Sequence, residues 1–287
     1  MAVVLASGLP AAAQADLGAT LSEVYGRWRQ AMTTGDAATW QAVTAEHRRM
    51  EVRNRLMSER AAFPAGVFAI PAPPPALAGL RLVQATQAGR TAKAVWFGKV
   101  DFGVGGDPTD NLLVLCFVAE GKGWKYDTAD FISLAGLPEV RKELQAGNDK
   151  YVRETKDFQP AGVVPPTAAP MAMAPYIAKV YVFCPGRDVQ LQVNKLSRHH
   201  FADTKAAEVV LGGAKDGLNE VQYGIKAMEG GTGKEAMTIR VYLMSEVPDV
   251  QPVKVFEYQI TEGGKPNDFG TGTFVVDPAV AQKLKGK

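Results

Sequence analysis

The spacing of apolar residues differs on the two sides of a proline-rich stretch in the chain. Before this stretch the chain opens with apolar positions at helical spacing, and after it apolar and polar residues alternate with a period of two. The stretch itself, residues 159–176, holds five prolines and no charged residue up to Pro175. Each proline removes a backbone donor and disfavours a helix in the residue before it. We therefore predict two domains joined by a semi-rigid linker over residues 157–176.

The first domain, residues 16–156, begins with a helical pattern. Gly35 ends the first predicted helix, and Asp36 is a typical N-cap for a second one. A third helix is predicted over residues 47–60, where arginines and glutamates at helical spacing predict a solvated, self-paired surface. The alternative interpretation of these arginines is an anion-binding patch. The apolar stripe of the first helix has spacings of three and four residues: Leu17, Leu21, Val24, Trp28 and Ala31.

Strands are predicted in the rest of this domain. A Gly-Lys-Gly turn joins the last two of them, and a short helix over 134–145 closes the domain. In the second strand one alternating face is apolar and the other is mixed, so a single core face is expected. Helices followed by antiparallel strands predict an α+β domain with helices on one face of a curved sheet. The predicted strands cover residues 80–88, 91–102, 112–120 and 124–131.

The opening of this domain resembles a known superfamily. The segment WRQAMTTGDAATWQAV, residues 28–43, is similar to the helix–GD–helix opening of NTF2-like (SnoaL-like, cystatin-like) proteins. The resemblance covers residues 17–145 and implies a cone of helices on a bent antiparallel sheet. Its members include enzymes, binding modules and dimerisation domains, so it implies no single function. It also implies that a homodimer could form through the sheet.

Alternation predicts an all-β second domain over residues 177–278. About seven short strands, each bounded by Gly, Pro, Asn or Asp, are typical of a two-sheet sandwich. The architecture is similar to that of immunoglobulin-like (Ig-like) and fibronectin-type modules, without the disulfide or the tryptophan of antibody domains. Residues 279–287 are predicted to form a basic tail, whose last part, residues 282–287, is expected to be frayed.

The first fifteen residues predict export. Met1–Ala15 is uncharged and apolar, and it ends in Ala13-Gln14-Ala15, which resembles the site that a signal peptidase accepts. We interpret residues 1–15 as a signal peptide and expect a periplasmic or cell-envelope protein. The alternative interpretation is a disordered alanine-rich tail.

Charge and cysteine content limit the classes of partner and the covalent links that can be expected. The net charge is +2, and neither half carries the basic excess of a nucleic-acid binder. No apolar run is long enough to span a bilayer. Of the two cysteines, Cys116 is expected to be a small buried hydrophobic residue, and a disulfide to Cys184 would have to bridge the domains. No cofactor is predicted.

Two further segments invite a chemical interpretation. The loop Glu229–Glu235, EGGTGKE, lacks the first glycine and the hydroxyl residue of a phosphate-binding loop, so we predict a hairpin loop. His199, His200 and Asp203 could be metal ligands, but adjacent histidines on an extended segment point to opposite sides. Two ligands make a poor site, so no metal is predicted.

The candidate pocket lies inside the cone of the first domain. Strand parity places Trp124, Tyr126 and Asp130 on one face, with Trp96 approaching from a neighbouring strand. An Asp general base beside a Tyr donor is the pair that ketosteroid-isomerase-like members of the superfamily use. The alternative is that the aromatic residues are core and Asp130 is a strand-end residue. His47 could equally lie on a helix surface.

These observations favour a non-catalytic, exported binding or assembly module of the cell envelope. Its expected partner is a protein or a small hydrophobic ligand. The alternative is an enzyme that uses the cone for acid–base chemistry on a small hydrophobic molecule. The two differ in whether the cone is open or filled by its own aromatic residues.

Overall fold

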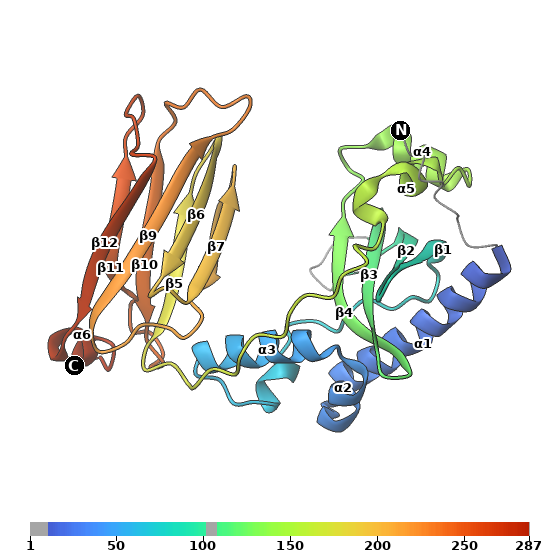
Figure 1. The fold of residues 1–287 in the computed structure, drawn as a ribbon, viewed down its shortest axis with the longest axis horizontal. Helices are drawn as coiled ribbons and strands as arrows, with labels where there is room; N and C mark the ends of the chain where they lie inside the picture. Colours follow the sequence, from blue (N-terminus) through green and yellow to red (C-terminus); the bar gives the residue numbers. More distant parts are fainter. Residues whose placement is uncertain (1–10, 102–107, 287) are drawn as a thin grey trace. The chain divides into compact units, whose positions relative to one another are not determined.

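The computed structural model describes residues 11–101 and 108–286, and it is an α+β structure with antiparallel sheets (Figure 1). The chain divides into two compact units. The first holds the described residues up to Glu51 together with Pro64–Ala168, and the second holds Val52–Phe63 and the chain from Ala169 onward. Within the described residues, no helix combines the length and apolar character needed to cross a membrane.

The first unit combines helices with one four-stranded sheet, whose strand order is β1-β2-β3-β4. Its strands lie within a few residues of the predicted ones, except that β2 ends at Lys99 and the predicted strand end, Phe102, is outside the described residues. The elements are α1 (Ala11–Thr34), α2 (Ala37–Val43), α3 (Glu46–Ser58), η1 (Ala65–Phe68), β1 (Arg81–Ala88), β2 (Thr91–Lys99), β3 (Asp110–Glu120), β4 (Gly123–Ile132), α4 (Pro138–Gln145), α5 (Lys150–Glu154) and η2 (Lys156–Phe158).

Local signals set the first helices as predicted. Gly35 has a φ of +71°, a conformation that glycine adopts without steric cost and that ends α1. Asp36 then caps α2, because its Oδ1 accepts a hydrogen bond from the Thr39 backbone N–H at 3.0 Å. Hydrogen bonds from Thr39 also lower the pKa of Asp36. Of the predicted signal peptide, residues 1–10 lie outside the described residues, and Ala11–Ala15 belong to α1.

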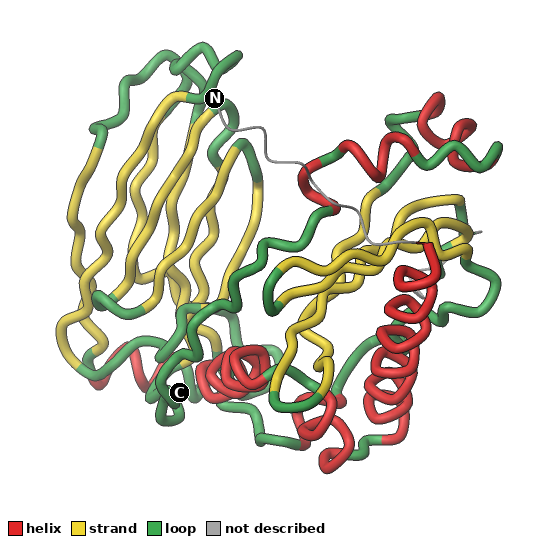
Figure 2. The backbone as a smooth tube through the Cα atoms, turned by 45° about the vertical axis from the view of Figure 1, so that its right-hand side comes forward, coloured by secondary structure: helices red, strands yellow, loops and turns green. Residues whose placement is uncertain are grey.

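The sheet of the first unit has a core on each face, not on one as predicted. Helix α1 covers one face with Leu21 and Tyr25, against Leu113 and Leu115 of β3. The other face is covered by the chain between β4 and the linker (Figure 2). The chain's own residues therefore cover part of the face through which the predicted homodimer would form. This second core joins β1–β3 to α4, α5 and η2: Val83, Val95, Phe97, Leu112, Val114, Leu134, Leu144, Val152 and Phe158.

The predicted linker is hydrogen-bonded to the rest of the chain on both sides of residues 163–168. In the first unit, the Gly162 N–H donates to Thr91 Oγ1 at 2.7 Å. In the second unit, the buried Asn54 side chain donates to Ala169 O and accepts from the Met171 N–H, both at 2.9 Å. Each end of the linker is thus fastened to one unit, and Pro165 and Pro166 restrict the backbone between Gly162 and Ala169.

Helix α3 contributes to both units, which the sequence did not predict. Its surface is only partly self-paired: Arg55 lies 3.6 Å from Glu59, but Arg53 donates to a linker carbonyl, that of Met171. Arg60, just after the helix, donates to Ala174 O at 2.8 Å. Ser58 accepts a hydrogen bond from the N–H of Gly212, a residue of the sandwich. Residues 52–63 are therefore part of the second unit's structure.

The second unit is a two-sheet antiparallel sandwich of eight described strands. One sheet has the order β11-β10-β5-β8 and the other β12-β9-β6-β7. In an immunoglobulin constant domain the first, second, fifth and fourth strands share a sheet. The strand order here differs, so the likeness to immunoglobulin-like modules is one of architecture. The strands are β5 (Ile177–Phe183), β6 (Arg187–Val193), β7 (Ser197–Ala202), β8 (Lys205–Val209), β9 (Gly217–Ala227), β10 (Met237–Met244), β11 (Val253–Ile260) and β12 (Phe269–Val276).

One continuous core fills the space between the two sheets. Alternate residues of both sheets contribute to it, as the period of two predicts. The C-terminal tail is not frayed as far as Leu284: α6 (Pro278–Lys283) is capped by Asp277, and Leu284 packs into the sandwich core. Loop 229–235 is not a hairpin, because β9 and β10 lie in different sheets. The buried Arg187 side chain holds this loop by donating to Gly233 O at 2.9 Å and to Glu235 O.

Candidate functional site

A β-bulge separates the residues of the predicted acid–base pair. Tyr126 pairs with Phe117, but Thr128 pairs with Cys116, so Asp127 is an extra residue in β4. Cross-strand partners lie on the same face of a sheet. Tyr126 therefore faces the core beneath α1, whereas Asp130, opposite Val114, lies on the face that carries the other core. The prediction that both share one face is wrong, and Asp130 is exposed.

Aromatic side chains of the first unit fill the space around Tyr126. Its ring centroid is 4.0 Å from that of Trp28 and 5.6 Å from that of Tyr25, and Phe117 meets it edge-on at 6.1 Å. Burial raises the pKa of Tyr126, and it raises that of Tyr25 to about 12. Of the other predicted pocket residues, Trp96 and Trp124 are half-buried against the same core. These groups pack together as core.

The bulge directs Asp127 to the start of α3. Its Oδ1 lies 2.9 Å from His47 Nε2 and accepts a hydrogen bond from Arg48 Nε at 3.0 Å. His47 is 2% exposed, so it is not a helix-surface residue. Nearby, the Ala45 N–H donates to Tyr126 O at 2.8 Å. The cluster joins α3 to β4 within the first unit, and a buried histidine beside a bulged aspartate was not recognisable from sequence spacing.

A second cluster, of the buried Ser197 and His199 with the exposed Glu208, has the contact order of a catalytic triad. Ser197 Oγ lies 2.8 Å from His199 Nε2, and His199 Nδ1 lies 2.6 Å from Glu208 Oε2. However, Ser197 is fully buried, and its Oγ accepts a hydrogen bond from the Leu211 N–H at 2.8 Å. Ser197 and Glu208 belong to β7 and β8, which lie in different sheets. The cluster therefore connects the two sheets, and its hydroxyl is out of reach of solvent.

The two adjacent histidines point to opposite sides of β7, as predicted. His199 is buried, whereas the side chain of His200 is 61% exposed and pairs with Asp188. Within the described parts of the chain, no group of three or more His, Cys, Asp and Glu side chains could hold a metal ion. Both cysteines are free. Burial raises the pKa of Cys116 to about 11, which keeps the thiol protonated near neutral pH.

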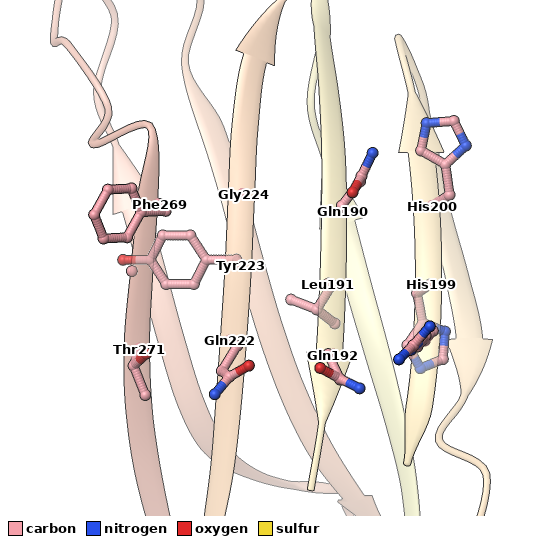
Figure 3. A pocket seen from close by; sticks show the side chains of 12 residues that line it. Gln190, Leu191, Gln192, His199, His200, Gln222, Tyr223, Gly224, Phe269 and Thr271 are labelled. Atoms are coloured by element: carbon pink, nitrogen blue, oxygen red, sulfur yellow. The ribbon is translucent and has the colours of Figure 1, made fainter. Parts of the chain in front are cut away.

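The outward face of sheet β12-β9-β6-β7 carries a candidate binding site. It is a shallow hollow of about 670 Å³, and polar side chains from all four strands line it (Figure 3). Strand register arranges the outward residues in two rows. The first row is Phe269, Gly224, Gln190 and His200, and the second is Thr271, Gln222, Gln192 and Arg198.

An exposed ring and a glycine shape this hollow. Phe269 is 81% exposed, although large apolar side chains are normally removed from water. Gly224 lies next to it and has no side chain, so a gap separates the ring from Gln190. Glycines also admit the inward aromatic rings: a Cβ at Gly270 would lie 2.4 Å from the Tyr223 ring. The edge strand is thus built to carry an aromatic ring on each side.

The centre of the hollow is uncharged. Gln190, Gln192 and Gln222 contribute side-chain amides, each of which can donate and accept hydrogen bonds. Gln222 Nε2 donates to Glu220 Oε1 at 2.8 Å, which orients that amide. The alternation of apolar and polar residues in the sequence is enough to place each of these glutamines on the outward side of its strand. Only the pairing of β6 with β9 places Gln192 opposite Gln222.

No protein-family model matches this chain, and neither a curated protein nor a solved structure matches it. Function is therefore argued from the site alone.

Proposed function

We propose that this chain is a non-catalytic, two-unit binding or assembly protein whose ligand lies on the outward face of sheet β12-β9-β6-β7. One observation carries the proposal: the 81% exposed Phe269 stands beside a hollow lined by polar side chains from four strands. An exposed aromatic anchor among convergent hydrogen-bonding groups is typical of a recognition site. The continuous core between the two sheets lies behind it and gives this site a rigid support.

The finer assignments are part of the same proposal. The helix–GD–helix opening supports an NTF2-like assignment for the first unit, and the sandwich architecture supports an Ig-like class for the second. The Ala13-Gln14-Ala15 segment supports export to the periplasm or cell envelope, where such modules would meet extracellular or envelope ligands.

The alternative is acid–base catalysis in the first unit, which requires a general base and a hydrogen-bond donor that face the same substrate. Tyr126 and Asp130 lie on opposite faces of β4, and Tyr126 is enclosed by Tyr25 and Trp28. The aromatic residues thus support a structural role for the first unit.

Small organic probes test the location of the site without knowledge of the ligand. The ¹⁵N-labelled full chain is titrated with phenol and with acetamide, which mimic the ring-binding and amide-binding parts of a ligand. We expect amide shift changes to cluster on β6, β7, β9 and β12, and Phe269→Ala to remove the phenol response. The proposal would be contradicted by amide shift changes that cluster around Tyr126. It would also be contradicted if no shift changes clustered on the outward face of sheet β12-β9-β6-β7.

A further inference from the structure

The ligand class follows from the hydrogen-bonding character of the face. We infer that the outward face of sheet β12-β9-β6-β7 binds a neutral oligosaccharide, an inference that rests on the proposed function. The second row presents a hydroxyl, two amides and one guanidinium in line, from Thr271, Gln222, Gln192 and Arg198. Sugar hydroxyls both donate and accept hydrogen bonds, as do amides and the threonine hydroxyl.

Phe269 supplies what a sugar ring needs on its apolar side. A pyranose has C–H groups on its faces, and these carry partial positive charge. The face of an aromatic ring carries partial negative charge and so attracts them. Phe269 is 81% exposed, and Gly224 beside it leaves room for a ring to approach.

Charge argues against an anionic ligand. Recognition of phosphate or carboxylate uses converging arginines or lysines. On this face His200 is paired with Asp188, and Arg198 contributes one cation at the end of a row. Lys226 also lies opposite Asp188 across the strands. The central positions of both rows are neutral, so an uncharged ligand matches them.

The position of the groups argues against a peptide. An extended peptide is normally bound by the backbone of an edge strand, with which it makes ladder hydrogen bonds. Here the groups are side chains on the face of a sheet, in a row that crosses four strands. Neighbouring strands are about 4.8 Å apart, so the row is about 14 Å long. A row of this length favours a chain of several linked rings over a single sugar.

The test compares neutral hexasaccharides with other polymers on the full chain. Cellohexaose, maltohexaose and hexa-N-acetylchitohexaose are titrated by calorimetry and by ¹⁵N chemical shifts, together with glucose, a galacturonic acid hexamer and a glycine–serine hexapeptide. We expect at least one neutral hexasaccharide to shift amides of β6, β7, β9 and β12. It should bind at least about tenfold more tightly than glucose, because several rings share the row.

Matched variants assign the binding to the face. Phe269→Ala and Gln192→Ala should each weaken the hexasaccharide about tenfold, since each removes one anchor. Phe183→Ala and Gln259→Ala change the same residue types on the other sheet, and they should leave the affinity unchanged.

The outcomes separate this inference from the proposed function. If the peptide or the galacturonic acid hexamer shifts the face and no neutral hexasaccharide does, the saccharide inference is wrong and the binding face stands. If a hexasaccharide binds but Phe269→Ala and Gln192→Ala have no effect, the inference is wrong as well. If neither these polymers nor phenol and acetamide affect the face, both proposals are wrong.

Discussion

The triad-like cluster in the sandwich should act on stability and not on a reaction. Ser197→Ala removes the Oγ that accepts the Leu211 N–H and contacts His199 Nε2, both at 2.8 Å. An ordinary hydrogen bond contributes about 1 kcal/mol, but leaving a buried partner unpaired costs about 1–3 kcal/mol. The His199 side chain is only 3% exposed, whereas water partly reaches Leu211. We therefore expect the free energy of unfolding to fall by about 2–3 kcal/mol.

Urea unfolding followed by far-ultraviolet circular dichroism measures this loss. With a urea dependence of about 2 kcal/mol per molar, the midpoint should move by about 1 M. Ser133→Ala is the matched control: Ser133 is exposed, and its Oγ also accepts a backbone N–H, that of Ala135, at 3.3 Å. The control should stay within about 0.5 kcal/mol of the parent chain.

Two results would refute this reasoning. The first is a Ser197→Ala midpoint equal to that of Ser133→Ala, which would mean that the network does not hold the sheets. The second is a fluorophosphonate adduct on Ser197 of the native chain, found by mass spectrometry. Such an adduct requires an accessible, activated hydroxyl, and Ser197 is fully buried.

Four further predictions follow from other parts of the structure. Asn54→Ala should cost about 1–2 kcal/mol in urea unfolding because two hydrogen bonds to the linker are lost, while the exposed Asn267→Ala should cost less than about 0.5 kcal/mol. Proteolysis within residues 161–168 should leave both fragments together in gel filtration, since residues 52–63 bind the chain after Ala169; separation without denaturant would contradict this. Glu235 accepts backbone hydrogen bonds that lower its pKa from 4.5 to about 2, so its stabilising contribution is present above pH 4.5 and is lost as the pH falls toward 2. Glu235→Gln should flatten that acid limb, and an unchanged limb would argue against the contacts. Tyr126→Ala should cost about 3–5 kcal/mol in urea unfolding if the ring is core, and a loss under about 1 kcal/mol would instead indicate an open pocket.

Short-range features of this protein were predictable from its sequence. Gly35 and Asp36 end one helix and begin the next because both effects depend on a few neighbouring residues. The alternation in β6 likewise predicts which side chains are buried, and an extended backbone at residues 199 and 200 predicts the opposite directions of His199 and His200. Such patterns depend on local backbone geometry, which is set by a residue and its sequence neighbours and not by distant parts of the chain.

Features that depend on pairing were decided only by the tertiary structure. One inserted residue, Asp127, reverses the faces of everything after it in β4 and so separates Tyr126 from Asp130. The attachment of residues 52–63 to the second unit depends on contacts more than a hundred positions apart. The row that joins Gln192 to Gln222 exists because β6 and β9 are neighbours in one sheet. Alternation shows on which side of its strand a residue lies, but it does not show which strands are neighbours in a sheet. The candidate site is formed by side chains from four neighbouring strands, so only the tertiary structure could reveal it.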